Sequence, residues 1–295
     1  MNNILLFLLS SIIWGSTWIV ITFQLGNVSP LISVVYRFVL ASSILFLYCY
    51  IRKKPFAFSG KQHFFIFIQG LLLFGINYWL TYIGITKISS ALAAILSTSI
   101  VYFNVLFAWM FLGDKIKKEV VTGATIGVIG ITLIFLPQLT LEEKTSDVIL
   151  GIVLVLVASI FASLGNIFSA KTQRLKVPVV QANALGMGYA ALFLSAIALV
   201  NGLNFSFDYS FKYISSLIYL ALFGSVIAFG AFLTLLGKVG PDKAGYISLV
   251  YPVIALIFST IFEDYRWDLL GLVGVLLILL GNFIAMGKLK KTHLR

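Results

Sequence analysis

The fold is decided by two similar stretches, LTYIGITKISSALAAILSTSIVYF at residues 80–103 and LTLLGKVGPDKAGYISLVYPVIAL at residues 233–256. When the first is laid on the second, five positions carry the same amino acid: Leu80, Thr81, Gly84, Ala91 and Leu96 match Leu233, Thr234, Gly237, Ala244 and Leu249. Further along, Gly123 and Gly130 match Gly274 and Gly281 after a small change in spacing. Matches at a fixed spacing indicate an internal repeat, so we expect the second half of the chain to repeat the fold of the first.

The composition around these stretches is that of a membrane protein. Apolar residues make up 60% of the 295 positions and charged residues 11%, whereas soluble domains have roughly 45–50% and about 25%. So few charged residues cannot cover a water-soluble globule. The same numbers argue against a disordered chain, and the single cysteine, Cys49, excludes a disulfide within one chain.

Ten apolar segments are each long enough to cross a membrane as a helix. A hydrocarbon core about 30 Å thick needs about 20 residues at a rise of about 1.5 Å per residue. Long continuous apolar runs predict helices rather than the strands of a barrel. The expected spans are residues 4–23, 31–51, 64–83, 91–112, 120–136, 148–170, 179–200, 213–236, 244–262 and 269–286.

The repeat divides these spans into two blocks of five. We expect a first repeat at residues 1–136, a periplasmic connection at 137–147, a second repeat at 148–287 and a basic cytoplasmic tail at 288–295. Because five is odd, the second block starts on the opposite side of the membrane, so the repeat is inverted. The prediction is an all-α integral membrane protein of two inverted five-helix repeats, an architecture typical of carriers that expose a central site to each side in turn.

The basic residues lie mainly on one side of the membrane in this topology. With the N-terminus inside, the cytoplasmic side receives Arg52, Lys53, Lys54, Lys61, Lys115, Lys117, Lys118, Lys171, Arg174, Lys176, Lys238, Lys243, Lys288, Lys290, Lys291 and Arg295. The other side receives only Lys87, Lys144, Lys212 and Arg266. The positive-inside rule therefore predicts that both termini are cytoplasmic. Basic residues at span ends are selected by membrane insertion, so their excess does not indicate nucleic-acid binding.

Four motifs stand out along the chain: IIWGSTWIVITF at the start, Arg37 within YRFVLA, FLGDKIKKEVVTGATIGVIGI and YPVIALIFSTIFEDYRW. Together they resemble the drug/metabolite transporter superfamily in its ten-helix EamA-type branch. The resemblance covers essentially the whole chain and implies a bacterial inner-membrane exporter of amino acids, metabolites or lipophilic drugs. The chain departs from the pattern at Ser99, where many relatives have Pro, and at Asp114, where many have Glu.

Arg37 is the one charged residue expected inside a span. A charge at the centre of a membrane helix costs about 2.5–3.5 kcal/mol on insertion scales. Arg37 lies seven residues after Pro30, so its side chain either extends to the periplasmic headgroups or faces the interior. In the interior it would anchor a substrate carboxylate or tie helices together.

No Asp or Glu falls within the expected spans, and His63 and His293 lie in cytoplasmic flanks. Carboxylates and imidazoles are the usual proton carriers inside membranes. The sequence therefore predicts facilitated diffusion or exchange without a dedicated proton site, and neither a metal nor a cofactor is expected.

Polar and aromatic residues in the spans are the candidates for lining a substrate cavity. Tyr78 and Tyr82 share a helix face, although with Trp79 they also fit a periplasmic aromatic belt. Mid-span polar groups avoid lipid, so Tyr102, Asn104 and Tyr251 are expected inside, either against substrate or in bonds between helices. The candidate substrate-binding residues are Trp14, Arg37, Asn77, Tyr78, Tyr82, Tyr102, Asn104, Ser248 and Tyr251.

Pro252 is the candidate hinge, because it removes a backbone donor and frees the carbonyl of Ser248. The glycine pairs, including Gly123 with Gly127 and Gly271 with Gly274, are expected to allow close packing of helices.

The resulting prediction is a transporter, expected to act as a monomer, that exports amino acids or related metabolites by alternating access. The alternatives are an exporter of lipophilic or cationic drugs and a non-transporting receptor or assembly subunit. An enzyme is disfavoured because no HExxH or GxSxG motif and no cluster of His or Cys occurs. A channel is disfavoured because neither charged rings nor a filter loop are found.

Overall fold

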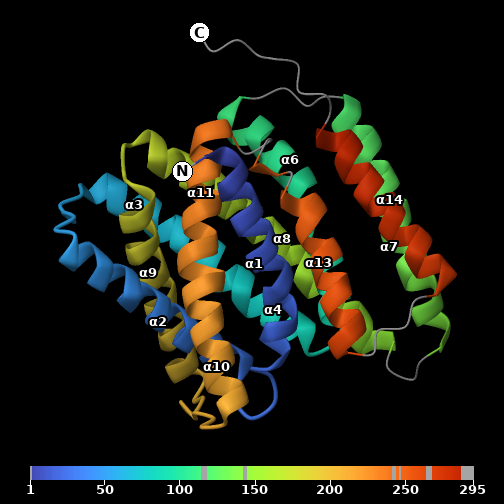
Figure 1. Cartoon of the computed structure of the whole chain (residues 1–295), viewed down its shortest axis with the longest axis horizontal. Helices are drawn as coiled ribbons and strands as arrows, with labels where there is room; N and C mark the ends of the chain where they lie inside the picture. Colours follow the sequence, from blue (N-terminus) through green and yellow to red (C-terminus); the bar gives the residue numbers. More distant parts are fainter. Residues whose placement is uncertain are drawn as a thin grey trace.

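The computed structural model describes residues 2–113, 118–141, 145–240, 244–245, 247–263 and 268–286. Every regular element in these ranges is a helix (Figure 1). Asp114, residues 142–144 of the 137–147 connection and the 288–295 tail lie outside the described residues.

The helices follow the ten expected spans closely. In chain order they are α1 (Asn3–Thr22), α2 (Pro30–Ile51), α3 with η1 and α4 (Gly60–Gly70, Leu71–Ile76, Asn77–Ile85), α5 with α6 (Ser90–Ser97, Ile100–Leu112), α7 (Lys118–Leu141), α8 (Thr145–Arg174), α9 (Val179–Val200), α10 with η2 and α11 (Phe211–Tyr219, Leu220–Ile227, Ala228–Val239), α13 (Ile247–Phe262) and α14 (Leu269–Met286).

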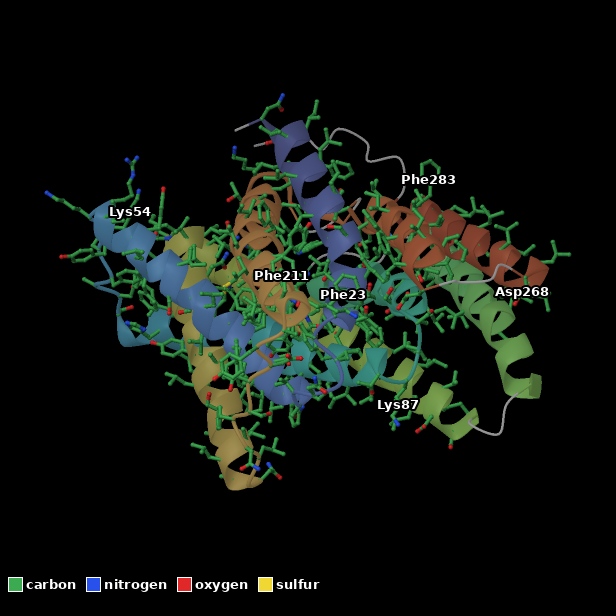
Figure 2. All side chains as sticks on the ribbon, turned by 60° about the horizontal axis from the view of Figure 1, so that its bottom comes forward. Phe23, Lys54, Lys87, Phe211, Asp268 and Phe283 are labelled. Carbon is green, nitrogen blue, oxygen red and sulfur yellow. The ribbon has the colours of Figure 1, made fainter. Side chains whose placement is uncertain are left out.

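Length and hydropathy agree with a membrane protein. Among the described residues, seven helical stretches are long and apolar enough to cross a membrane, and two shorter apolar helices lie at residues 250–262 and 269–284. Many large apolar side chains face outward from the bundle, including Phe283, labelled in Figure 2. Lys54, at the end of α2, points away from the helices. The fold class predicted from the sequence is confirmed: this is an all-helical membrane protein with ten spans.

The packing repeats after every five spans. The second spans of the two halves, α2 and α9, pack along each other, and so do the fifth spans, α7 and α14. The first span, α1, packs against α13 of the ninth span, and the sixth span, α8, packs against α5 and α6 of the fourth. In Figure 1, α7 and α14 form a pair at one edge of the bundle.

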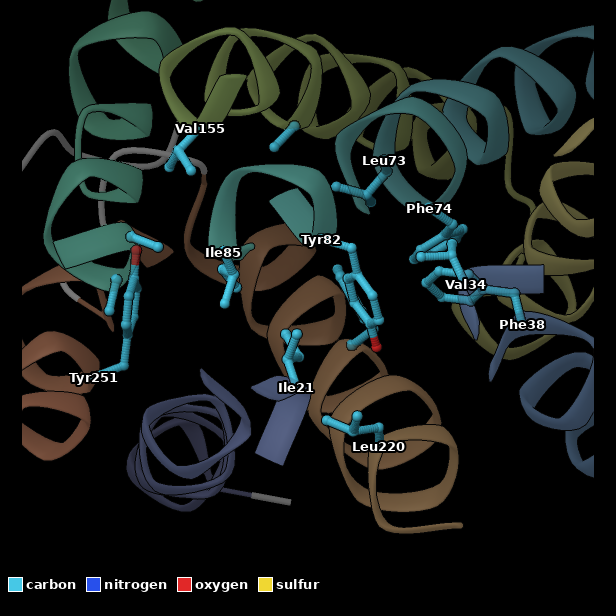
Figure 3. Close-up of a cluster of buried hydrophobic side chains, with 14 of the residues drawn as sticks. Ile21, Val34, Phe38, Leu73, Phe74, Tyr82, Ile85, Val155, Leu220 and Tyr251 are labelled. Carbon is cyan, nitrogen blue, oxygen red and sulfur yellow. The ribbon is translucent and has the colours of Figure 1, made fainter. Parts of the chain in front are cut away.

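The third and eighth spans contain wide turns at equivalent places. η1 and η2 are π-helical, and each contains the tripeptide Leu-Phe-Gly, at residues 73–75 and 222–224. A π-helical turn inserted in an α-helix often marks a functional position. Here the two segments lie at the centre of the bundle, where Leu73, Phe74 and Leu220 join the buried cluster of Figure 3.

The fourth span is interrupted without a proline. α5 ends at Ser97 and α6 begins at Ile100, with a tighter turn at Thr98 and Ser99. The hydroxyls of Ser97 and Thr98 donate to the carbonyls of Ala94 and Ile95 at 2.7 Å, and such bonds favour bends in helices. Serine at position 99 therefore does not prevent a break in this span.

Candidate functional site

A cavity of about 120 Å³ lies at the centre of the bundle. It is lined by side chains of six spans, three from each half: the first, third, fourth, sixth, eighth and ninth. The lining residues are Trp14, Thr17, Trp18, Ile21, Leu73, Asn77, Tyr78, Thr81, Ser97, Ile100, Asn104, Ser159, Ala162, Asn166, Phe229, Phe232, Gly245, Ile247, Ser248 and Tyr251. None of them is charged.

Aromatic rings form much of the wall. The ring of Trp14 lies 5.0 Å from that of Phe229 and 4.9 Å from that of Phe232, measured between centroids. Its indole nitrogen donates to the carbonyl of Gly224 at 3.3 Å. Trp18 stacks on Tyr251 with 6.3 Å between centroids. These contacts fix flat apolar surfaces from both halves of the chain around one space.

A polar group faces the cavity where the fourth span meets the sixth. The Asn104 side-chain oxygen accepts hydrogen bonds from the hydroxyl of Ser163 at 2.8 Å and the amide of Asn166 at 3.4 Å. Asn166 is 1% exposed, and its own side-chain oxygen has no hydrogen-bond partner. Buried acceptors are rarely left unpaired. This oxygen is therefore a candidate acceptor for a donor on a molecule inside the cavity.

Tyr251 joins the halves on another side of the cavity. Its hydroxyl lies 2.7 Å from that of Ser97, which belongs to α5. Tyr251 stands directly before Pro252 in α13, and the helix continues through the proline. A role for Pro252 as a hinge remains a prediction.

Arg37 lies in the interior rather than at the headgroups. It is 0% exposed, and its Nε donates to the hydroxyl of Ser225 in η2 at 2.9 Å. Its Nη1 lies 3.4 Å from the hydroxyl of Tyr82, which in turn donates to Gln24 at 2.8 Å. Arg37 does not itself line the cavity, although its guanidinium carbon lies 4.4 Å from the ring centroid of Tyr78, which does.

The candidate residues named from the sequence divide into two groups. Trp14, Asn77, Tyr78, Asn104, Ser248 and Tyr251 line the cavity, whereas Arg37, Tyr82 and Tyr102 do not. Tyr102 contacts the fifth span instead, and its hydroxyl donates to the carbonyl of Gly123 at 3.2 Å. Because Ile100 and Asn104 share one face of α6, Tyr102 points to another face.

The sixth span contributes lining residues that were not among the candidates named from the sequence. Ser159 and Asn166 lie within a long apolar run, and a buried Asn at mid-span is itself a signal of an interior position. The eighth span contributes Phe229 and Phe232. No sequence signal distinguishes these two from phenylalanines that face lipid.

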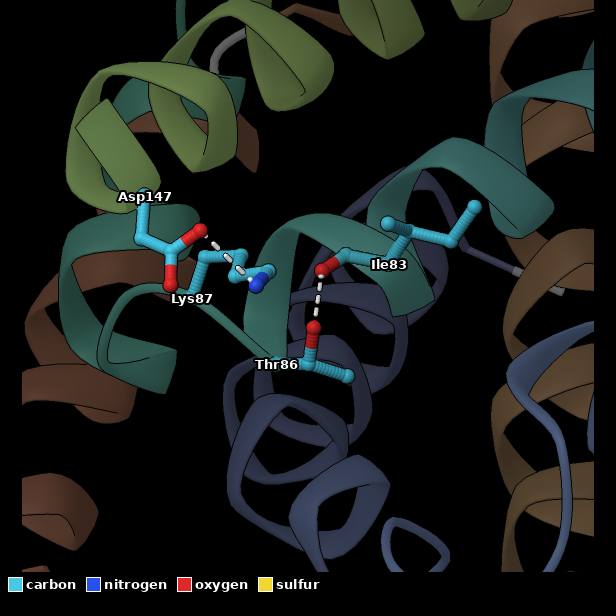
Figure 4. Close-up of polar contacts among 4 residues, drawn as sticks. All are labelled: Ile83, Thr86, Lys87 and Asp147. Atoms are coloured by element: carbon cyan, nitrogen blue, oxygen red, sulfur yellow. Dashed lines mark hydrogen bonds and ion pairs between the residues drawn. The ribbon is translucent and has the colours of Figure 1, made fainter.

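Three contacts join the two halves at the end of the bundle opposite Lys54. The carboxylate of Glu263 accepts from the hydroxyl of Ser90 at 2.6 Å. The ammonium of Lys87 lies 2.9 Å from Asp147 (Figure 4). The backbone amide of Ser210 and the side chain of Asn27 donate to Asp208, which lowers the pKa of that carboxyl below its usual value. At this end of the bundle the two halves are therefore linked by bonds between polar and charged groups.

Known proteins share both the sequence pattern and the fold. The model of the EamA-like transporter family matches residues 1–136 and 149–287. The uncharacterized inner membrane transporter YedA of Escherichia coli K12 is 28% identical over 94% of this chain and 90% of its own length. Protein PagO of Salmonella typhimurium is 25% identical over 96% and 92%. A crystal structure that is 15% identical in sequence superposes with a TM-score of 0.69 over 96% of each chain, which supports the fold alone.

Proposed function

The chain belongs to the EamA-like transporter family, and from this premise we propose that it carries amino acids or related metabolites across the bacterial inner membrane by alternating access. The observation that carries the proposal is the cavity, which both halves of the chain line at the centre of the membrane-spanning bundle. In this architecture two halves rock about a shared site and open it to each side in turn. The proposed orientation places both termini in the cytoplasm.

The movable parts proposed for this cycle flank the cavity. η1 and η2 interrupt the third and eighth spans next to the lining residues Asn77 and Phe229. A π-helical turn has a looser hydrogen-bond ladder than an α-helix, so bending is expected to concentrate there. On the periplasmic side, opening requires release of the contacts of Ser90 with Glu263 and of Lys87 with Asp147.

The lining supports a small, mainly apolar solute with few polar groups. Indole and phenyl rings provide surface for an organic side chain, while Asn104, Asn166 and Ser248 provide sites for hydrogen bonds. Lipophilic drugs are the second candidate, because the aromatic wall fits them equally well. Cationic drugs are disfavoured by the buried positive charge of Arg37 behind Tyr78.

Transport is expected to be independent of a proton gradient. Among the described residues, the carboxylates lie at helix ends or in connections, as Asp147 and Glu263 do, and none lines the cavity. Purified protein in liposomes should therefore exchange radiolabelled amino acids at rates that change less than about twofold when a pH gradient is imposed. Protein-free liposomes are the control. Uphill accumulation of an amino acid driven by the pH gradient would contradict this mechanism. If neither an amino acid nor a lipophilic dye showed any flux, transport itself would be contradicted.

A further inference from the structure

The guanidinium of Arg37 keeps unused hydrogen-bonding capacity in the interior. Arg37 is fully buried, and its Nη2 has no hydrogen-bond partner. Arginine carries five N–H donors in a planar fork that matches a carboxylate. Ser225 and Tyr82 accept from Nε and Nη1, and the hydroxyl of Tyr78 also lies near the guanidinium. The two N–H groups of Nη2 are therefore unsatisfied, which is unfavourable for a buried group.

Arg37 also lacks a counter-ion. Within the described part of the chain, the ion pair is that of Lys87 with Asp147, and no carboxylate lies within salt-bridge distance of Arg37. Its partners are neutral hydroxyls and the rings of Tyr78 and Phe38. A buried charge is normally paired, because desolvation of an unpaired ion costs several kcal/mol.

The free side of the guanidinium lies directly behind the cavity wall. Nη2 and the methyl group of Thr17 both approach Gly224, where a Cβ atom would lie 3.0 Å from Nη2 and 2.9 Å from that methyl group. Thr17 and Tyr78 both line the cavity. The side chains of Thr17 and Tyr78 therefore lie between the charge and a bound molecule, and contact between the two requires these side chains to move.

The equivalent position in the other half supports a role beyond packing. α2 and α9 have the same length, and Gly186 in α9 occupies the place that Arg37 has in α2. Gly186 packs against the backbone of Gly70. A residue without a side chain therefore fits at this position of the fold. The two halves differ here because the first half has a buried charge, Arg37, where the second half has Gly186.

We propose that the missing counter-ion is the carboxylate of the substrate, held by Nη2 of Arg37. This inference rests on the proposed function and narrows it to solutes that carry a carboxylate. A charge-assisted pair of this kind is worth about tenfold or more in affinity. The competing interpretation is that Arg37 only ties α2 to α4 and η2 through Tyr82 and Ser225.

The test compares carboxylates with their amides on purified protein. The probe pairs are L-phenylalanine with L-phenylalaninamide, L-leucine with L-leucinamide, and 3-phenylpropionate with 3-phenylpropanamide, measured by titration calorimetry. The wild-type protein should bind the carboxylate of at least one pair about tenfold or more tightly than the amide. In Arg37→Met the ratio should fall to about one. The matched control is Arg52→Met, at the exposed end of the same helix, and it should keep the wild-type ratio.

A second variant tests the same contact without removing the charge. Gly224→Ala places a methyl group against Nη2 and Thr17, so it should lower the preference several-fold, whereas Gly230→Ala faces open space and should not. Equal binding of both members of every pair, no binding of any carboxylate, or a preference that survives in Arg37→Met would overturn the proposal. Flux in liposomes distinguishes a failure of this proposal from a failure of the proposed transport function. Flux without a preference for carboxylates would refute only the role of Arg37. A preference for carboxylates without flux would refute only transport.

Discussion

Gly70→Ala should lower the stability and the folded yield of the protein more than any other alanine substitution of a helical glycine described above. Gly70 lies where α3 crosses α9, and a Cβ atom there would overlap the backbone carbonyl of Gly186. The overlap is with backbone rather than with a flexible side chain, so the two helices must move apart. Overpacking of this kind costs about 1–3 kcal/mol, which exceeds the gain of up to about 1 kcal/mol in helix propensity.

The measurement is the temperature at which half of the detergent-solubilised protein remains monodisperse on size-exclusion chromatography. We expect a fall of a few degrees, using the shift of about 2–4 °C per kcal/mol that is typical of large domains. Gly230→Ala is the matched control, because a Cβ atom at this helical glycine meets nothing within 4 Å. It should leave the midpoint unchanged or raise it. Equal midpoints for the two variants would show that the close contact of α3 with α9 is not needed.

Trp14→Ala should reduce transport about tenfold or more while the protein still reaches the membrane. Trp14 faces the cavity, packs against Phe229 and Phe232 and bonds the carbonyl of Gly224 in η2. Its removal takes away a large contact surface for a bound solute, and a loss of about 1.4 kcal/mol is already tenfold in affinity. Initial rates of radiolabelled amino-acid exchange in liposomes, at matched protein content, measure the effect.

Trp109→Ala serves as the control for the loss of an indole. Trp109 lies on α6 with half of its surface exposed toward the outside of the bundle, so its removal should leave exchange rates within about twofold of wild type. If Trp14→Ala transports as fast as Trp109→Ala, the central cavity is not the transport site.

The arrangement of spans could be predicted from the sequence because each span is a long apolar run. Bilayer thickness fixes the length of such a run, and the positions of Lys and Arg predict its direction. The internal repeat was also visible in the sequence. However, a single spacing between matching residues of the two halves does not align their whole spans. The tripeptides at residues 73–75 and 222–224 lie 149 positions apart, whereas Leu80 matches Leu233 at a larger spacing. η2 and α11 (Leu220–Val239) are longer than η1 and α4 (Leu71–Ile85), and apolar sequence does not reveal where a π-helical turn is inserted.

The site was only partly predictable, because it depends on which way each helix face is turned. Central position and polarity identified Asn104 and Tyr251 as interior residues, and both line the cavity. The same reasoning placed Tyr102 inside, either against substrate or in a bond between helices, and its bond to the carbonyl of Gly123 in α7 is of the second kind. Tyr102 lies two residues from both Ile100 and Asn104 and therefore on another face of α6. Arg37 shows the same limit: the sequence left two directions open for its side chain, and packing against η2 selects the interior.

Access to the cavity from both sides of the membrane is the central claim, and cysteine labelling tests it most directly. Cys49 is buried and is the single cysteine of the chain, so Cys49→Ala gives a background without thiols. Ser97→Cys and Ser159→Cys then place one thiol in the cavity wall, from the first and the second half respectively. A membrane-impermeant thiol reagent is applied to one face at a time, in right-side-out and inside-out vesicles. If the halves alternate around a shared cavity, both thiols react from either face; if both thiols react from one face only, under every substrate gradient applied, alternating access is contradicted.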